Sequence, residues 1–190
     1  MSRVGKAPVA IPKGATVQLR NGVVALKGPK GEMTIPMPPD ITVAQESDRL
    51  VLKRANDLDA TRAKHGLAQR LLRNAVLGVT QGFTRELEIV GVGFRAAKSA
   101  DKLVLSVGYT RPVDVRIPKG VDVAVESNTK IVLKGADKHV LGQLAADIRA
   151  VRPPSVYSDN KGIRYSGERV RKKAGKTAGA GATGAAGGAK

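Results

Sequence analysis

The chain has 190 residues, of which 42% are apolar and 3% aromatic, and it contains no cysteine. This length accommodates one or two domains with a hydrophobic core. The absence of cysteine excludes disulfides, cysteine-ligated zinc, iron–sulfur clusters and thiol nucleophiles. With 33 Lys and Arg against 16 Asp and Glu, the formal net charge is +17, which is typical of a protein that binds a polyanion such as nucleic acid.

No apolar run approaches the roughly 18 residues of a membrane-spanning helix, and the first twelve residues lack the apolar core of a signal peptide. We therefore expect a cytoplasmic protein without membrane contact. The charge is uneven, because the last 39 residues carry nine basic and two acidic side chains, whereas residues 82–151 carry eleven and eight. A basic extension on a folded body indicates an arm that lies along a polyanion.

An internal repeat relates the two halves of the chain. Residues 22–47 align with residues 102–127 at an offset of 80, and Gly28, for example, falls on Gly108. The near-constant offset predicts a duplicated structural unit.

In chain order, the first copy opens with short β-branched runs that are separated by turn residues. They predict strands at residues 22–27, 32–37, 41–45 and 49–54. A helix is predicted over residues 58–79, because apolar residues recur at every fourth position on one face. These residues are Ala63, Leu67, Leu71, Ala75 and Val79. Asp57 or Asp59 is expected to cap the helix and Gly82 to end it.

The second copy repeats this order. Strands are predicted at residues 85–91, 102–107, 113–117, 121–126 and 130–133. A helix follows up to Val151, with Asp137 at its N-cap, and Pro153 and Pro154 stop it. Its apolar positions are Val140, Leu141, Leu144, Ala145, Ile148 and Val151.

Together these elements predict an α+β fold of two tandem similar domains. Each is a small, mainly antiparallel sheet with one helix packed on a face, because short loops favour antiparallel pairing. The predicted divisions are residues 1–81, residues 82–152, a flexible basic extension over residues 153–176 and a disordered Ala/Gly tail over residues 177–190. Residues 1–14 are expected to form an arm or an edge strand.

Catalysis has little support in the sequence. The two histidines, His65 and His139, lie in no metal-binding spacing, and we expect them at a surface or helix flank. Residues 91–96 match the dinucleotide pattern GxGxxA, but too few residues follow before the next strand for a helix to open there. The glycines are better explained by a bulge or a close backbone approach. We predict no catalytic residue, no metal, no cofactor and no small-molecule substrate.

Nucleic-acid binding fits the composition better. The predicted strands contain too few aromatic residues for base stacking on a sheet, which favours recognition of phosphates and shape by Lys and Arg in folded RNA. The segment over residues 152–176 is most basic, and its glycines allow close approach to phosphate. Tyr157 and Tyr165 either stack on RNA or pack on the second helix. The predicted RNA-binding residues are Arg3, Lys6, Lys30, Arg152, Tyr157, Lys161, Gly162, Arg164, Tyr165, Arg169, Arg171, Lys172, Lys173 and Lys176.

Six stretches of the chain resemble one known family in the same order. They are MSRVGKAP at residues 1–8, KGPKGE at 27–32, VGVGFRA at 90–96, LVLSVGYT at 103–110, IRAVRPP at 148–154 and KGIRY at 161–165. Over residues 1–176 the sequence resembles the bacterial sixth protein of the large ribosomal subunit. The resemblance implies two duplicated α+β domains, binding to large-subunit ribosomal RNA (rRNA) chiefly through the second domain and its extension, and no catalysis. It also implies neighbouring ribosomal proteins and a place near the stalk base, close to the sarcin–ricin loop and the elongation-factor site.

Two features depart from the family pattern. Residues 155–160 read SVYSDN, where the family has Tyr-Lys-Gly-Lys-Gly, so one lysine is missing and an acidic residue is present. The tail after Lys176 is longer than in the family. A DNA-binding architectural protein is the main alternative, since the basic tail suits either polymer, but neither half shows a helix-turn-helix. An enzymatic function is the third and weakest hypothesis.

Overall fold

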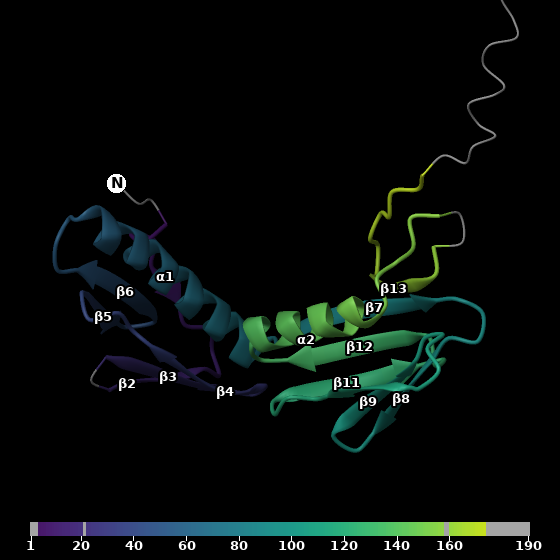
Figure 1. Ribbon diagram of the computed structural model, residues 1–190. Coiled ribbons are helices and arrows are strands. Elements are labelled where there is room, and N and C mark those ends of the chain that lie inside the picture. Colours follow the sequence, from purple (N-terminus) through teal and green to yellow (C-terminus); the bar gives the residue numbers. More distant parts are fainter. Residues whose placement is uncertain (1–3, 21, 158–159, 174–190) are drawn as a thin grey trace, which may run out of the picture.

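The computed structural model describes residues 4–20, 22–157 and 160–173 and consists of two similar halves that follow one another along the chain (Figure 1). Each half contains one helix and two small sheets, and every strand pair within the described residues is antiparallel. The predicted α+β class is therefore confirmed. The prediction of a single sheet in each half is wrong, because each sheet divides into two.

In the first half, two three-stranded sheets surround the inner face of one helix. One sheet has the order β1-β6-β5 and the other β2-β3-β4. The elements are β1 (Val9–Ala10), β2 (Thr16–Arg20), β3 (Val23–Gly28), β4 (Gly31–Pro36), β5 (Ile41–Glu46), β6 (Arg49–Arg54) and α1 (Asp59–Thr80). Alternate strand residues point inward, so Leu26 of β3 and Leu50 of β6 meet Leu72 of α1 in a common core.

Helix α1 packs with a face different from the one that its apolar spacing predicts. Only Ala75 and Val79 of the predicted stripe are buried, whereas Ala63, Leu67 and Leu71 are exposed. The buried face runs instead through Thr61, His65, Ala68, Gln69, Leu72 and Val76. Small and polar residues occupy the inner face near the start of α1, where the backbone of neighbouring segments comes close.

His65 explains part of this difference and corrects the expectation that it lies at the surface. It is 3% exposed, and its Nε2 atom lies 3.1 Å from the carbonyl oxygen of Leu52 in β6. The backbone of Gly5 packs directly against the imidazole, since a Cβ at Gly5 would overlap the ring. His65 is thus a core residue that ties α1 to β6 and to the N-terminal segment, while His139 is exposed as expected.

The second half repeats the arrangement with one additional strand. A four-stranded sheet has the order β11-β12-β7-β13, and a three-stranded sheet has the order β10-β9-β8. Its elements are β7 (Phe83–Val90), β8 (Arg95–Ser99), β9 (Lys102–Ser106), β10 (Val113–Arg116), β11 (Val121–Glu126), β12 (Lys130–Gly135), α2 (Lys138–Val151) and β13 (Gly162–Tyr165). Leu141, Leu144 and Ile148 of α2 are buried against Leu87 and Leu133, so the predicted inner face of α2 is confirmed.

Strands β2, β8 and β13 lie outside the predicted strands. The alternative of an edge strand near the N-terminus is the one that the structure shows, at β1. Strand β8 follows the loop that matched the dinucleotide pattern, and Gly91 lies there at φ 152° with the Phe94 ring packed against it. This close approach replaces the helix that a dinucleotide site requires.

The two halves meet at the end of α1. Gly78 packs against the loop before α2, because a Cβ at Gly78 would overlap the carbonyl oxygen of Ala136. On the first half's own side, the Lys30 amide donates to the carbonyl oxygen of Val79 at 2.9 Å. Gly82, at φ 76°, then ends the helix as predicted. Within the described residues, no helix is both long enough and apolar enough to cross a membrane.

The two helices begin differently, because only α2 has a side-chain N-cap. Leu58 precedes α1 without a side-chain cap, so neither Asp57 nor Asp59 caps that helix. Asp137, as predicted, accepts hydrogen bonds from the amides of His139 at 2.7 Å and Val140 at 3.4 Å.

We expect Asp137→Ala to lower the free energy of unfolding by about 0.5–2 kcal/mol, because an alanine leaves the first-turn amides of α2 without this acceptor. Asp137→Asn keeps an acceptor oxygen and serves as the control, with less than half of that loss. Urea titration of both variants measures the difference, and equal losses would contradict the capping role.

Candidate nucleic-acid interface

The predicted RNA-binding residues occupy different environments in the structure. Most lie beyond α2, in the connection from α2 to β13, of which residues 153–157 and 160–161 are described, in β13 itself, and in a basic segment over residues 169–173 (Figure 1). Lys6 and Lys30 lie in the first half. Arg3 and Lys176 lie outside the described residues, as do the predicted Ala/Gly tail and two residues of the departing loop.

Strand β13 is one of the two edge strands of the four-stranded sheet and contains three of the predicted contacts. It pairs antiparallel with β7, with Gly162 opposite Val90 and Tyr165 opposite Leu87. Part of the segment predicted to be a flexible extension is therefore built into the second half. Because side chains alternate across a strand, Ile163 enters the core at 0% exposure while Arg164 points to the other face.

Gly162 has a packing role at the start of β13. It is buried at φ 140°, where a Cβ would lie 2.5 Å from the Pro153 carbonyl oxygen and 2.7 Å from Pro154 Cα. Only glycine fits this close approach of β13 to the end of α2. The Ile163 amide also donates to the Arg152 carbonyl oxygen at 2.7 Å, which closes the loop.

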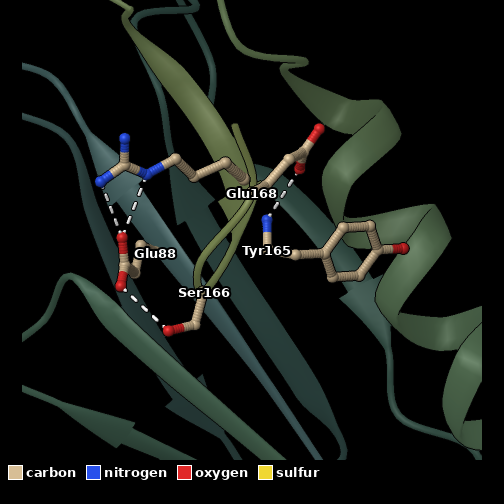
Figure 2. A network of polar contacts seen from close by, with 5 residues as sticks. Glu88, Tyr165, Ser166 and Glu168 are labelled. Atoms are coloured by element: carbon tan, nitrogen blue, oxygen red, sulfur yellow. Dashed lines mark hydrogen bonds and ion pairs between the residues drawn. The ribbon is translucent and has the colours of Figure 1, made fainter. Parts of the chain in front are cut away.

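Arg164 is held by an ion pair on the outer face of the sheet. Its Nε and Nη2 atoms lie 3.0 and 2.9 Å from Oε2 of Glu88 in β7, and the Ser166 hydroxyl donates to Oε1 of the same carboxylate at 3.2 Å (Figure 2). Hydrogen bonds from Arg164 keep the pKa of Glu88 below its usual value. This pairing uses the guanidinium to hold β13 on the sheet.

A second ion pair lies on the helix side of β13. Arg149 of α2 donates from Nε to Oε2 of Glu168 at 3.0 Å and from Nη2 to Oε1 at 2.5 Å. The Tyr165 amide also donates to Oε2 at 3.0 Å, and the Tyr165 ring points toward the helix (Figure 2). The Arg149 guanidinium lies 5.8 Å from the centre of that ring. Of the two alternatives for Tyr165, the structure thus shows packing on the second helix.

These two carboxylates predict a loss of stability in acid. The pKa values of Glu88 and Glu168 are lowered in the folded chain, chiefly by hydrogen bonds from Arg164 and Arg149. A group with a lowered folded pKa stabilises the fold above its unfolded pKa, and this contribution is lost as the pH falls through the folded pKa.

Between about pH 5 and pH 3 we therefore expect the free energy of unfolding to fall more steeply for the wild type than for the Glu88→Gln/Glu168→Gln variant. Urea titrations at several pH values measure both slopes. A wild-type slope equal to that of the variant would contradict this assignment.

The loop before β13 brings aromatic and basic side chains together at the end of α2. The Arg152 guanidinium lies 5.1 Å from the centre of the Tyr109 ring, and the Tyr109 hydroxyl donates to the Val151 carbonyl oxygen at 2.9 Å. Tyr109 and Tyr157 are 47% and 63% exposed, and Lys161, which follows Tyr157 in the same loop, is also exposed. The arrangement leaves rings and cations accessible to a nucleic acid.

The segment over residues 169–173 follows the Glu168 ion pair and is the most cationic part of the described chain. Arg169, Arg171, Lys172 and Lys173 are exposed, and none of them forms an ion pair within the described residues. A surface hollow of about 700 Å³ is lined by Arg169, Val170, Arg171 and Lys172. At its far end, the Lys173 amide donates to the Val156 carbonyl oxygen at 2.8 Å, so the segment arches back to the loop.

The remaining candidates, Lys6 and Lys30, are exposed in the first half. Lys30 borders a groove of about 640 Å³ where the halves meet, together with Lys134 of β12. Neither residue belongs to the cluster beyond α2. The two also lie apart, because Gly5, next to Lys6, packs on His65 near the start of α1, whereas the Lys30 amide donates to Val79 at its end.

Sequence reasoning missed the acidic partners that organise this region. Glu88 and Arg164 are separated by 76 residues, so no local pattern links them. Tyr109 was visible only as part of a motif of the family resemblance. Glu168 had a signal, because it is the single acidic residue between residues 160 and 176.

Comparison with known proteins identifies the family of the duplicated fold. The family model for ribosomal protein L6 matches residues 11–82 and 90–166, which are most of both halves, including β13. The chain belongs to the ribosomal protein L6 family. The resemblance found in its motifs is thereby confirmed.

Relatives in this family cover almost the whole chain. A large ribosomal subunit protein uL6 from Listeria monocytogenes (strain HCC23) is 49% identical over 177 residues, which are 93% of this chain and 99% of the relative. Proteins of the same name from Synechococcus sp. (strain JA-3-3Ab) and Moorella thermoacetica are each 50% identical over 93% of this chain and over 97% and 96% of their own lengths.

Membership of the L6 family gives the chain a structural role. It is a structural constituent of the large subunit of the cytoplasmic ribosome, and it is not an enzyme. This agrees with the exposed cations of the segment over residues 169–173.

Proposed function

We propose that this L6 protein binds and stabilises folded large-subunit rRNA through its basic segment over residues 169–173. The observation that carries the proposal is the exposure of four cationic side chains, three of which line one hollow, without acidic partners among the described residues. Lys and Arg in such an arrangement neutralise phosphates and release the counterions of RNA. Arg side chains add planar two-point contacts to phosphate.

The neighbouring loop extends this surface. Arg152, Tyr157 and Lys161 lie at the same end of the second half, and Tyr109 joins them through its contact with Arg152. An exposed tyrosine stacks on a sugar or an unpaired base, whereas the cations hold the backbone. We propose Arg3, Lys6, Lys30 and Lys176 as further contacts.

The proposed domain boundaries follow the two hydrophobic cores. One core is built from residues between 9 and 79 and the other from residues between 87 and 163. We propose that residues 1–81 and 82–152 fold as separate domains, and that residues 153–176 form an RNA-binding extension anchored by β13.

Competition between RNA and DNA tests the main proposal against its alternative. We expect the full chain to bind a large-subunit rRNA transcript at moderate salt and to retain it against an excess of duplex DNA of equal phosphate content. Preference for the duplex DNA would support the architectural DNA-binding function instead. Binding to both with equal affinity and salt dependence would show that only non-specific phosphate contact is present.

We further propose a position near the base of the stalk, close to the elongation-factor site, which is supported by the six family motifs. The chain has no cysteine, so Lys172→Cys provides a single attachment site for an iron chelate on the reconstituted large subunit. Hydroxyl radicals from this site should cleave RNA around the stalk base and the sarcin–ricin loop. Cleavage confined to distant helices would contradict this position.

A further inference from the structure

An acidic side chain stands at the start of the most cationic segment of the chain. Glu168 directly precedes Arg169 and is the single carboxylate between residues 160 and 176. Close to a polyanion, a carboxylate weakens binding by Coulomb repulsion. At its position next to a proposed RNA-binding segment, Glu168 is therefore expected to have a structural role that outweighs this repulsion.

The contacts of Glu168 indicate what that role is. Its carboxylate accepts three hydrogen bonds, two from Arg149 and one from the Tyr165 amide, and its side chain is 24% exposed. Its own amide donates to the Tyr165 carbonyl oxygen at 3.0 Å, across a turn that contains Gly167 at φ 78°. Backbone and side chain together fix the direction in which the chain leaves β13 (Figure 2).

The basic segment is also fixed at its other end. The Lys173 amide donates to the Val156 carbonyl oxygen at 2.8 Å, and Val170 is half-buried between the two anchors. Residues 169–173 thus form an arch, held by Glu168 at one end and by the loop at the other. Such an arch loses less conformational freedom on binding than a free tail does.

We infer that Glu168, clamped by Arg149, is a positioning residue that presents the arch of residues 169–173 to the phosphates of folded rRNA. The inference rests on the proposed function of the basic segment. According to this inference, the Glu168 carboxylate favours RNA binding by positioning the arch, although its negative charge alone would disfavour binding. Arg149, correspondingly, acts through Glu168 and need not touch the RNA.

The sign of this effect makes the test decisive. If only Coulomb interactions operate, Glu168→Gln binds rRNA more tightly, Arg149→Gln binds more weakly, and the double variant, which has the net charge of the wild type, returns to wild-type affinity. If Glu168 positions the arch, all three variants bind the folded rRNA transcript about tenfold more weakly, because each breaks the same clamp.

A second RNA separates positioning from general effects. An unstructured single-stranded RNA of equal length reports charge alone, so Glu168→Gln should bind it as well as the wild type does or slightly better. Glu126→Gln is the matched control, because Glu126 is an exposed carboxylate paired with Lys130 at 3.6 Å and is not linked to the arch. It should not lose affinity for either RNA.

The experiment uses the full chain in filter-binding titrations at fixed salt, with the thermal midpoint of each variant measured in parallel. Unchanged or tighter binding of the folded transcript by Glu168→Gln would overturn the inference. Equal losses on both RNAs with a lowered thermal midpoint would also overturn it, since they show a merely structural role. A wild type without preference for the rRNA transcript would instead refute the proposed function itself.

Discussion

Replacing Arg171, Lys172 and Lys173 by alanine is expected to weaken binding to large-subunit rRNA by about 100-fold at moderate salt. Each of the three side chains is exposed and, within the described residues, free of acidic partners, so each is available for a phosphate. Charge-assisted hydrogen bonds of this kind contribute about 1.5–3 kcal/mol at best and less where water competes. Binding titrations between about 50 and 200 mM salt measure the loss.

The salt dependence gives the same variant a second readout. The slope of log affinity against log salt should flatten by roughly one unit for each phosphate contact that is lost, and thus by two to three units for the triple variant. An unchanged slope would mean that these residues are solvated and do not touch RNA.

A matched control removes the same charge from the body of the second half. Lys98, Lys102 and Lys130 form surface ion pairs with Asp122, Asp114 and Glu86, respectively. Their replacement by alanine lowers the net charge equally and should reduce the affinity far less, because these cations lie outside the arch. Similar losses in both triple variants would indicate binding through net charge alone.

Gly162→Ala is expected to destabilise the second half by about 2–5 kcal/mol. The backbone at φ 140° lies in a region that residues with a Cβ rarely adopt, and the new methyl group would overlap the backbone of Pro153 and Pro154. Relief of this overlap requires β13 to move away from the end of α2. Denaturant titration measures the loss.

The consequence for function follows from the position of β13. Because the arch begins just after this strand, Gly162→Ala should weaken RNA binding under conditions in which the rest of the chain remains folded. Gly142 provides the control, since it lies in α2 with open space where a Cβ would be placed. Gly142→Ala should raise stability by about 0.5–1 kcal/mol. A Gly162→Ala variant as stable as the wild type would contradict the proposed packing of β13.

The repeat and the turn residues predicted the fold class because both are local signals. Most strands of each copy, the inner face of α2 and the Asp137 cap follow from alternation, periodicity and capping chemistry. The face of α1 did not follow, because apolar spacing alone places Leu67 and Leu71 inside. The approach of Gly5 and β6 makes His65 the better inner residue.

The sequence predicted the candidate site as a basic segment, but it did not predict which of its basic side chains are paired with carboxylates. Charge density indicated a basic segment over residues 152–176 directly in the sequence. It did not separate Arg164, which pairs with Glu88, from Arg171, which has no such partner among the described residues. That distinction depends on β13 pairing with β7, and four residues with a single buried aliphatic side chain give too weak a pattern for a strand.

Sedimentation from a cell lysate tests the central claim most directly. The tagged full chain is followed through sucrose gradients at normal and low magnesium, with and without ribonuclease. Stoichiometric migration with the large subunit, kept after the subunits separate and lost after RNA digestion, is the result that the account predicts. A chain that stays at the top of the gradient, or that migrates with DNA, would contradict it.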